Sequence, residues 1–322
     1  MMRKIDETDK KILYELDLNS RQPISQISKK IDIHENSIKY RIKKLEKLGV
    51  INNYYTVIDS VKLGYLPVKL YLKFEFTTPE IEERIINFFT QNTQTWWVAS
   101  LEGRFDLAVH MLVKNFTLFS DFWDVTLEKF NNYIGAELFA QYFYLTSFEY
   151  SYLSNRNIIK KRKKFTITND RKVIIIDDLN YRILKLIASN ARINLSELAE
   201  ILSLTPEAIT YRIKKLEMLH IIQGYRLNIN LQKIGYKNFK IDIILGDYKQ
   251  RDEIIKYIEN NNNLVFICKS AGVSHLELGF HLLDINHLIE IINDLKIRFP
   301  KAIKNYYYLL VSKQHKWEFM PK

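Results

Sequence analysis

The sequence predicts an α+β protein in which two three-helix, winged-type helix-turn-helix domains alternate with two βαββαβ ferredoxin-like domains. Three observations lead to this prediction. A seven-residue stretch occurs twice in the chain. Each copy lies among short apolar stripes of helical period, and each is followed by a strand–helix–strand–strand–helix–strand pattern. The 322 residues suffice for two to four domains of ordinary size.

The repeat indicates a duplicated unit. Residues 40–46, Tyr-Arg-Ile-Lys-Lys-Leu-Glu, recur unchanged at 211–217, which is an offset of 171 residues. At that offset, 22 of the 61 positions from 5 to 65 are identical without a gap. Because this period is far longer than the repeat of a solenoid, we expect two copies of one domain arrangement.

Each copy begins with three short predicted helices. In the first copy only residues 32–34 separate the second apolar stripe from the third, a spacing typical of a helix-turn-helix. In the second copy Thr205 is a good N-cap and Pro206 suits the first helical turn. The three stripes of the first copy are Ile12, Leu13 and Leu16, then Ile24, Ile27 and Ile31, then Ile38, Ile42 and Leu45.

The outward face of the third helix is the predicted DNA-binding surface. Amides, hydroxyls and long cations on a protruding helix can hydrogen-bond base edges and phosphates in a major groove. Arg41 lies at the edge of the inward face, and a solvated basic face is the other reading of this pattern. The candidate DNA-binding residues are Asn36, Ser37, Lys39, Tyr40, Arg41, Lys43, Lys44, Lys47, Thr210, Tyr211, Arg212, Lys214 and Lys215.

The two copies differ in charge. The whole chain carries a formal net charge of +11, which suits a polyanionic partner such as DNA. Residues 21–48 carry a net +5, whereas the matching residues 192–219 are neutral. Since phosphate contacts supply much of DNA affinity, we expect the first helix-turn-helix to contribute more of the binding.

The regions after the helix-turn-helix units each match a ferredoxin-like βαββαβ order. The predicted elements of the first region are strand 68–76, helix 79–92, strands 95–101 and 105–113, helix 116–131 and strand 136–145. Those of the second are strand 239–245, helix 251–261, strands 264–270 and 275–282, helix 286–299 and strand 303–311.

These residues resemble the feast/famine (Lrp/AsnC) family of transcriptional regulators. The resemblance rests on Ile5-Asp6, Asp9, Ile12-Leu13, Leu16 and Arg21, then on Arg41-Ile42, Leu45-Glu46 and Gly49-Val50-Ile51. It implies a DNA-binding regulator whose ferredoxin-like domain pairs with a second copy and binds a small effector, often an amino acid, near that interface. The second copy departs from the pattern at Asn180 and His220, which replace Asp9 and Gly49.

The resemblance also indicates a candidate effector site. The family motif Gly-x-Tyr/Phe-Asp-Leu appears here as Gly103, Phe105, Asp106 and Leu107, so the first three are the effector candidates. The second copy lacks the acid, and aromatic residues fill the last strands of both domains. These aromatics are interpreted mainly as core and interface residues, since buried aromatics usually pack.

The expected domains are a helix-turn-helix domain over 1–53, a ferredoxin-like domain over 54–150, a basic linker over 151–172, a second helix-turn-helix over 173–224 and a second ferredoxin-like domain over 225–322. The linker carries a net +7, and we expect a mobile segment that either follows DNA phosphates or serves as a solvated tether. We further expect the two ferredoxin-like domains to pack together as a covalent pseudo-dimer. Assembly into a homo-oligomer is left open.

Other chemistries find little support in the sequence. With one cysteine, Cys268, the chain has no cysteine-based metal site, and a reducing cytoplasm is expected. The spaced histidines His275, His281 and His287 lack companion ligands, so neither a metal nor a cofactor is expected. No membrane segment and no enzyme activity are expected. The alternatives are an enzyme like the siroheme decarboxylases, which resemble the same fold pair, and a ligand-sensing scaffold that does not bind DNA.

Overall fold

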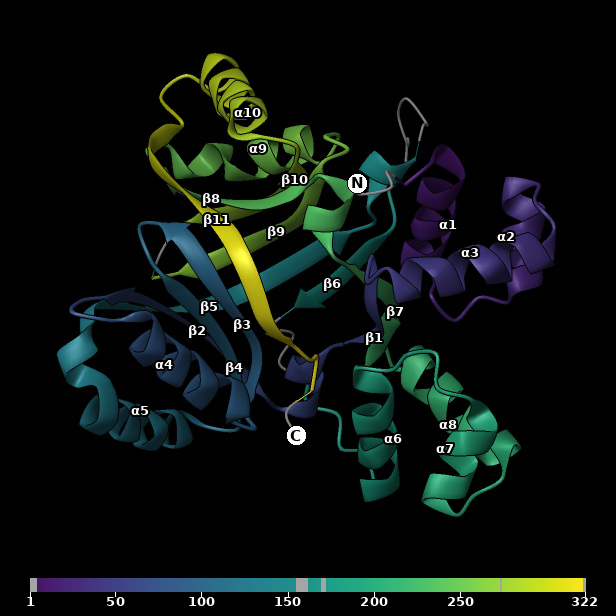
Figure 1. The fold of residues 1–322 in the computed structure, drawn as a ribbon. Coiled ribbons are helices and arrows are strands. Elements are labelled where there is room, and N and C mark those ends of the chain that lie inside the picture. Colours follow the sequence, from purple (N-terminus) through teal and green to yellow (C-terminus); the bar gives the residue numbers. More distant parts are fainter. Residues whose placement is uncertain (1–4, 155–161, 169–171, 273, 321–322) are drawn as a thin grey trace.

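The computed structural model describes residues 5–154, 162–168, 172–272 and 274–320 (Figure 1). The Lys160-Lys161 part of the basic linker lies outside these residues. The elements occur in the predicted order, with five short 3₁₀ turns between them: Ser60–Leu63, Asn131–Tyr133, Ser151–Leu153, Leu231–Ile234 and Tyr248–Gln250.

Two three-helix units form the helix-turn-helix heads, here called head 1 and head 2. Asp6 and Asp9 form a capping box at the start of α1, and the Thr205 hydroxyl accepts the Ala208 backbone N–H at the start of α8. Head 1 consists of α1 (Glu7–Leu18), α2 (Ile24–Ile31) and α3 (Glu35–Lys47), and head 2 of α6 (Asp178–Ala188), α7 (Leu195–Leu202) and α8 (Pro206–Met218).

The wing strands of the two heads pair with each other. β1 (Ile51–Ile58) and β7 (Ile222–Ile229) form an antiparallel two-stranded ribbon. Ile51 lies opposite Ile229 and Ile58 lies opposite Ile222. Because Ile222 and Ile229 are the repeat equivalents of Ile51 and Ile58, the ribbon has the self-complementary register of a twofold interface. The predicted boundaries at 53/54 and 224/225 fall inside these two strands.

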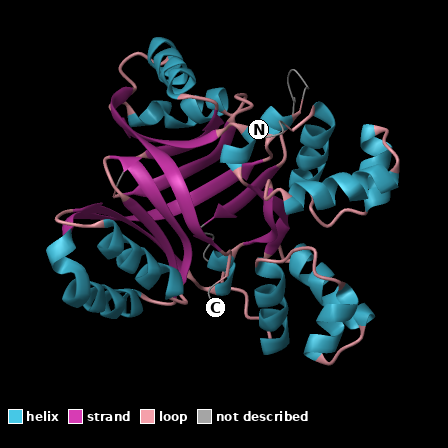
Figure 2. Cartoon of the chain, viewed as in Figure 1, coloured by secondary structure: helices cyan, strands magenta, loops and turns pink. Residues whose placement is uncertain are grey.

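Both ferredoxin-like domains have the predicted βαββαβ order, and their helices cover the outside of the sheet (Figures 1 and 2). Their last strands are longer than expected. Domain 1 contains β2 (Leu66–Phe74), α4 (Pro79–Gln91), β3 (Thr95–Gly103), β4 (Leu107–Val113), α5 (Phe116–Phe130) and β5 (Ile134–Phe148). Domain 2 contains β8 (Lys237–Leu245), α9 (Arg251–Ile258), β9 (Leu264–Ala271), β10 (Leu276–Leu282), α10 (Ile285–Arg298) and β11 (Ile303–Trp317).

The long last strands join the two domains into one sheet, which confirms the expected packing of the domains on each other. β11 pairs with β8 of its own domain and with β3 of domain 1, and β5 pairs with β2 of its own domain and with β9 of domain 2. The strands follow the order β2-β4-β3-β11-β8-β10-β9-β5, and the β2–β5 pairing closes the ring. A closed ring leaves none of these strands as an open edge.

Strand alternation separates an outer apolar layer from an inner, more polar one. In β2, Leu70 and Leu72 pack under the helices of domain 1, whereas Lys69 and Tyr71 point inward. In β10, Leu278 likewise belongs to the outer core of domain 2. The interior of the ring therefore receives every second side chain of its strands.

The basic linker is partly built into the fold, so the expectation of a mobile tether is wrong for residues 162–168. β6 (Lys164–Thr168) pairs with β5, and Arg162 is buried. The Arg162 guanidinium donates to the backbone carbonyls of Glu149, Asn261 and Leu264. The cation run predicts either an arm along DNA phosphates or a solvated tether, but one of its members, Arg162, satisfies carbonyl groups that would otherwise be buried without donors.

Two glycines allow the halves to approach closely. Gly103 and Gly272 have φ angles of +129° and +111°. A Cβ atom at Gly103 would lie 2.9 Å from the Tyr308 carbonyl oxygen, and one at Gly272 would lie 2.3 Å from that of Phe139. Both glycines thus lie where the last strand of the opposite domain crosses.

We expect Gly272→Ala to lower the free energy of unfolding by about 3 kcal/mol, because the new methyl adds a backbone clash to left-handed strain. Gly235→Ala is the matched control, since its φ is +81° but nothing lies within 4 Å of the added Cβ. It should cost about 1 kcal/mol in urea unfolding. Equal losses would contradict the close approach of the two domains.

Candidate DNA-binding helices and interior chamber

The third helix of each head exposes the predicted DNA-binding face. In α3, Lys39, Lys43 and Lys47 are exposed, and Tyr40 is 69% exposed. Tyr211 occupies the same place on α8 and is 66% exposed. The other predicted positions also lie on these helices, Lys44 and Thr210 being half-buried and the rest exposed: Asn36, Ser37, Lys44, Thr210, Lys214 and Lys215.

The remaining two candidates, Arg41 and Arg212, bind within their own heads. Arg41 Nη1 lies 2.7 Å from carboxylate oxygens of both Asp6 and Asp9, and Arg212 Nη1 lies 2.8 Å from Asp177. Hydrogen bonds to the carboxylates raise the pKa of Arg41. These arginines fix the third helix against the start of the first, so the exposed lysines are the cations available for phosphate.

The two heads hold each other through reciprocal contacts. The Arg21 guanidinium of head 1 lies 5.3 Å from the ring centre of Tyr225 on β7, and Arg192 of head 2 lies 5.0 Å from that of Tyr54 on β1. The residue before each arginine donates its backbone N–H to the carbonyl of the same tyrosine, at 3.0 and 2.9 Å. Each head is therefore fixed to the wing of the other.

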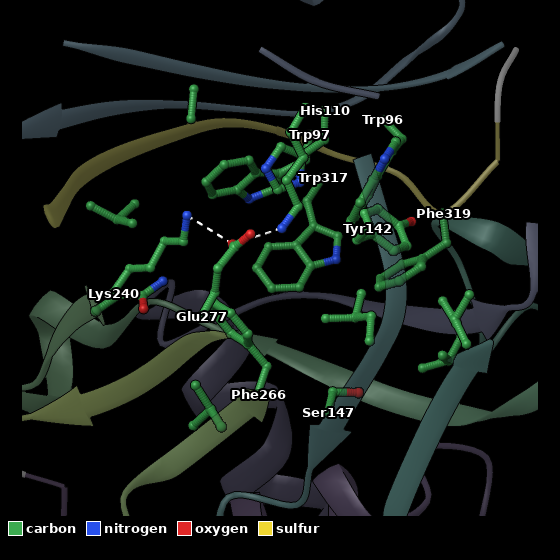
Figure 3. Close-up of a pocket in the computed structure, with 18 of the residues that line it drawn as sticks. Trp96, Trp97, His110, Tyr142, Ser147, Lys240, Phe266, Glu277, Trp317 and Phe319 are labelled. Carbon is green, nitrogen blue, oxygen red and sulfur yellow. Dashed lines mark hydrogen bonds and ion pairs between the residues drawn. The ribbon is translucent and has the colours of Figure 1, made fainter. Parts of the chain in front are cut away.

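An interior chamber of about 140 Å³ lies between the ring of strands and the β1–β7 ribbon (Figure 3). Strands of both domains contribute to its walls, and a cavity of this size holds a benzene-sized molecule. Ten of its lining residues are aromatic: Tyr55, Tyr71, Trp96, Trp97, Tyr142, Tyr150, Phe165, Phe266, Trp317 and Phe319.

A buried ionic cluster lies in one wall of the chamber. Lys69 Nζ and Lys240 Nζ lie 2.7 and 2.8 Å from the same Glu277 carboxylate oxygen, and the three side chains are at most 10% exposed. The lysines occupy equivalent positions of the repeat, one on β2 and one on β8. Burial raises the pKa of Glu277, but the two ammonium groups lower it by more, so Glu277 is ionised at neutral pH.

Several polar atoms of the chamber lining lack a hydrogen-bond partner among the described residues. They are His110 Nε2, Trp96 Nε1, Trp317 Nε1 and Asn238 Oδ1. Burial, together with the positive charges of Lys69 and Lys240, lowers the pKa of His110 well below its usual value, so its ring is neutral. These residues of the lining thus carry buried N–H groups that have no acceptor among the described residues.

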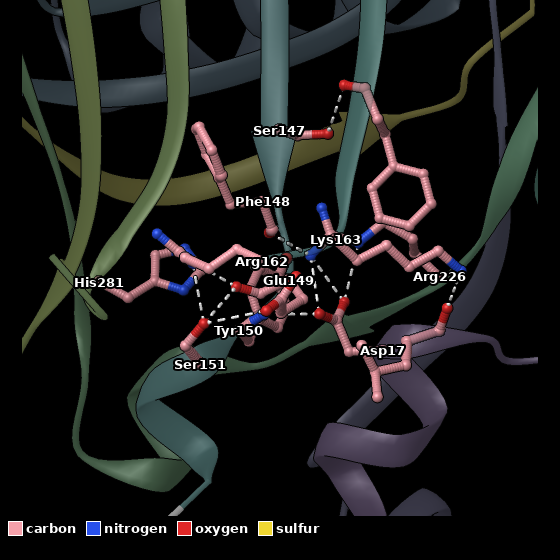
Figure 4. Close-up of polar contacts among 12 residues, drawn as sticks. Asp17, Ser147, Phe148, Glu149, Tyr150, Ser151, Arg162, Lys163, Arg226 and His281 are labelled. Atoms are coloured by element: carbon pink, nitrogen blue, oxygen red, sulfur yellow. Dashed lines mark hydrogen bonds and ion pairs between the residues drawn. The ribbon is translucent and has the colours of Figure 1, made fainter. Parts of the chain in front are cut away.

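One ion pair connects the chamber wall to head 1 (Figure 4). Arg226 lines the chamber from β7, and its Nε and Nη2 bind the two Asp17 carboxylate oxygens of α1 at 2.9 and 2.8 Å. Burial lowers the pKa of Arg226, but the charge of Asp17 raises it by more. The repeat equivalents on head 2 are Tyr55 and Ala188, which carry no charges, so the chamber contacts the two heads differently.

The candidate effector residues do not line the chamber. Gly103 lies at the β3–β11 crossing, and Phe105 is buried beside Tyr71. The Asp106 carboxylate accepts the Phe74 backbone N–H and the Lys73 ammonium, both at 2.7 Å. The motif therefore has a local structural role here, and its acid is already paired within the chain.

One signal of the chamber is present in the sequence, although the predicted site residues do not include it. Lys69 and Lys240 are separated by the repeat offset of 171 and lie in largely apolar strands, Val68–Leu72 and Phe239–Ile243, the second of which also contains Asp242. A lysine repeated at one position of two apolar strands indicates a paired, buried role rather than a solvated one. Their meeting point at Glu277 required the domain pairing, which only the structure provides.

Metal and membrane chemistry find no site in the described residues. Their His, Cys, Asp and Glu side chains form no group of three or more that could hold a metal ion. His275 Nδ1 accepts the Leu245 backbone N–H, and His281 Nδ1 is 2.8 Å from the Tyr152 hydroxyl, so both rings have hydrogen-bond partners within the chain. No helix in this part of the chain is long and apolar enough to cross a membrane.

Comparisons of sequence identify the heads. A family model described as winged helix-turn-helix DNA-binding matches residues 5–52 and 176–223. An uncharacterised HTH-type transcriptional regulator of Pyrococcus furiosus is 42% identical over 82 residues, which are 26% of this chain and 52% of that protein. The HTH-type transcriptional regulator LrpB of Bacillus subtilis is 29% identical over 123 residues, 37% of this chain and 80% of that protein. The chain spans about half the length of several curated relatives that it matches.

Comparison of structures extends over nearly the whole chain. The crystal structure of the siroheme decarboxylase NirDL is similar with a TM-score of 0.64 and 14% sequence identity, covering 98% of this chain and 94% of that one. The same protein has also been solved with an iron-uroporphyrin III analogue. At this identity, the likeness establishes a shared tandem fold.

Replacing Arg226 with Met should lower the free energy of unfolding by about 3 to 5 kcal/mol, because it leaves the Asp17 carboxylate buried without its partner. Arg212→Met removes a comparable arginine–aspartate pair in which Asp177 is 54% exposed, and it should cost about 1 kcal/mol or less. Urea unfolding of both variants tests this difference. A small loss for Arg226→Met would show that the buried pair is not a structural anchor.

Proposed function

This chain belongs to the Lrp/AsnC family of helix-turn-helix proteins, and from that premise we propose that it is a transcriptional regulator that binds double-stranded DNA. Its two heads act as a covalent pseudo-dimer, and a small effector bound by the ferredoxin-like domains tunes the binding. The observation that carries this proposal is the exposed lysine face of α3, on a helix fixed by internal ion pairs. We propose no enzymatic reaction and no cofactor for it.

The DNA contacts would be unequal. Head 1 presents the exposed cations Lys39, Lys43 and Lys47, whereas the matching positions on head 2 are Thr210, Lys214 and Met218. Cations at these positions neutralise phosphates and release counterions, so head 1 would supply more of the affinity and of its salt dependence. Head 2, joined through the ribbon and the arginine–tyrosine contacts, would set the orientation and spacing of the bound site.

An effector in the chamber would act on head 1 through Arg226. This side chain touches both the chamber and Asp17 of α1, and it donates a further hydrogen bond to the Phe148 carbonyl at the end of β5. A ligand that shifts β5 or β7 would therefore change the position of α1. The uncharged Tyr55 and Ala188 give head 2 no such contact.

A siroheme-decarboxylase-like enzyme is the second candidate. The near full-length likeness to NirDL and the unpartnered His110 ring nitrogen in the chamber favour it. Two observations weigh against it: the chamber of about 140 Å³ matches one small ring rather than a tetrapyrrole, and the exposed lysine face of α3 suits a polyanion such as DNA.

Charge reversal of head 1, Lys43→Glu with Lys44→Glu, should weaken DNA binding at least tenfold and flatten the dependence of affinity on salt. The matched change on head 2, Lys214→Glu with Lys215→Glu, should weaken it less. The assay is gel-shift titration at two stated salt concentrations, on a site recovered by selection from random DNA. Equal losses would contradict the unequal contributions of the two heads. If the unmodified chain selects no DNA, the proposal that it is a transcriptional regulator is overturned.

A tetrapyrrole titration separates the two candidates. We expect no absorbance change when an iron uroporphyrin is added to the full chain, because the chamber admits one ring as its side chains lie. His110→Ala serves as the matched variant. Saturable binding that this variant abolishes, followed by loss of carboxyl groups from the porphyrin, would favour the enzyme.

A further inference from the structure

We infer that the DNA site of this chain is an inverted repeat that departs from symmetry at one base pair, where Asn36 of head 1 reads adenine and Glu207 of head 2 reads cytosine. The inference deepens the proposed function and rests on it. Asn36 and Glu207 are equivalent at the repeat offset of 171 residues. Both side chains are exposed, and both lie in the first turn of the third helix of their head. The first turn of that helix is the part that contacts base edges in a helix-turn-helix complex.

The third helices of the two heads have the same rotation about their axes, because their inward faces are the same. Three apolar residues on each helix are at most 6% exposed: Ile38, Ile42 and Leu45 on α3, and Ile209, Ile213 and Leu216 on α8. These residues fix the phase of the helix, which turns by 3.6 residues. Positions 36 and 207 therefore lie at the same point of the outward face.

The wing ribbon relates the two third helices by a twofold arrangement. Its register pairs residues that are equivalent in the repeat, such as Ile51 with Ile229. Arg41 and Arg212 fix the two helices in the same way, at 2.7 and 2.8 Å from Asp6 and Asp177. Reading helices related by a twofold axis meet half-sites of opposite direction. Equivalent helix positions thus meet equivalent base pairs of the two half-sites.

The side chains at this shared position differ in hydrogen-bonding chemistry. The Asn36 carboxamide both donates and accepts, which matches N7 and the N6 amine of adenine. The Glu207 carboxylate only accepts, which matches the N4 amine of cytosine. Among the described residues, neither side chain has a hydrogen-bond or ion-pair partner. Both are therefore available to a base.

The helix dipole alone does not account for Glu207. A carboxylate in the first turn stabilises any helix, and Glu197 in the first turn of α7 has that role outside the third helix. Glu207 lies one turn from Tyr211, which is 66% exposed on the predicted DNA-binding face. A carboxylate on this face repels phosphates, so it weakens binding to every sequence except those that place an amine opposite it.

The exposed tyrosines define a position that the two half-sites share. Tyr40 lies one turn after Asn36, as Tyr211 lies one turn after Glu207, and the two tyrosines are similarly exposed, at 69% and 66%. Identical side chains at equivalent points favour the same base. The two half-sites should therefore agree at the base pair beside the tyrosines and differ at the base pair beside the first turn.

The first experiment is selection of random double-stranded DNA by the full, unmodified chain at a stated salt concentration. The recovered site should contain two inverted half-sites that differ at one equivalent position, with A·T in one and C·G in the other. A perfect palindrome as the preferred site would overturn the inference and leave the regulator standing. Recovery of no DNA would overturn both.

The second experiment compares the affinities of two duplexes, the recovered site and a symmetric version in which C·G is replaced by A·T. The unmodified chain should bind the recovered site about tenfold more tightly. Glu207→Asn gives both heads the same side chain, so it should reverse this preference. Because the result is a ratio for one protein sample, partial unfolding of the variant cannot produce the reversal.

Glu197→Asn is the matched control. It removes the same charge from the first turn of a neighbouring helix of head 2, so it should strengthen binding to both duplexes alike and leave the ratio unchanged. Asn36→Glu is the reciprocal variant, and it should change the preferred base under head 1 from adenine to cytosine. If Glu207→Asn keeps the preference of the unmodified chain, or if Glu197→Asn reverses it, the assignment of base reading to Glu207 is wrong.

Discussion

The shared pairing of β5 and β11 is the constraint on which the other features depend. Each strand has 15 residues and pairs with strands of both domains, so neither domain can complete its sheet alone. The closed ring that results buries the inward side chains of both halves in one interior. It also brings β1 and β7 together, and through them the two heads. A duplicated chain thus obtains the geometry of a dimer at a fixed one-to-one ratio.

Within this symmetric frame the side chains have diverged, and the divergence is concentrated where charge is buried. Lys69 and Lys240 keep the symmetry, but only domain 2 supplies the carboxylate, Glu277, that both bind. Asp17 and Arg226 form a buried pair on one side of the pseudo-axis, where the other side has Ala188 and Tyr55. Buried charges tolerate little change, because removing one partner leaves the other unpaired. Buried ion pairs therefore preserve a difference between the two halves of the chain that surface charges could lose.

The sequence predicted those features that depend on local patterns. Helix periodicity, the Thr205-Pro206 start signal and the repeat gave the heads, the order of strands and the packing of the two domains. It could not predict the chamber, because residues from strands of both domains meet there only after β5 and β11 cross. Arg41 shows the same limit: its position on the helix wheel was right, but its partners Asp6 and Asp9 lie more than thirty residues away.

The charged contact between the chamber and a head is made to head 1, which is also the more basic of the two heads. The lysines of α3 repel one another, so under the proposed function DNA phosphates would stabilise head 1 more than head 2. Arg226 and Asp17 connect that head, and not the neutral one, to the chamber. A ligand in the chamber can shift the equilibrium between two conformations of the chain only through contacts that differ between those conformations. Under the proposed function, this charged contact lies at the head whose position would matter most for DNA affinity. The two asymmetries would then favour a division of labour in which head 1 responds to the chamber and head 2 sets the position on DNA.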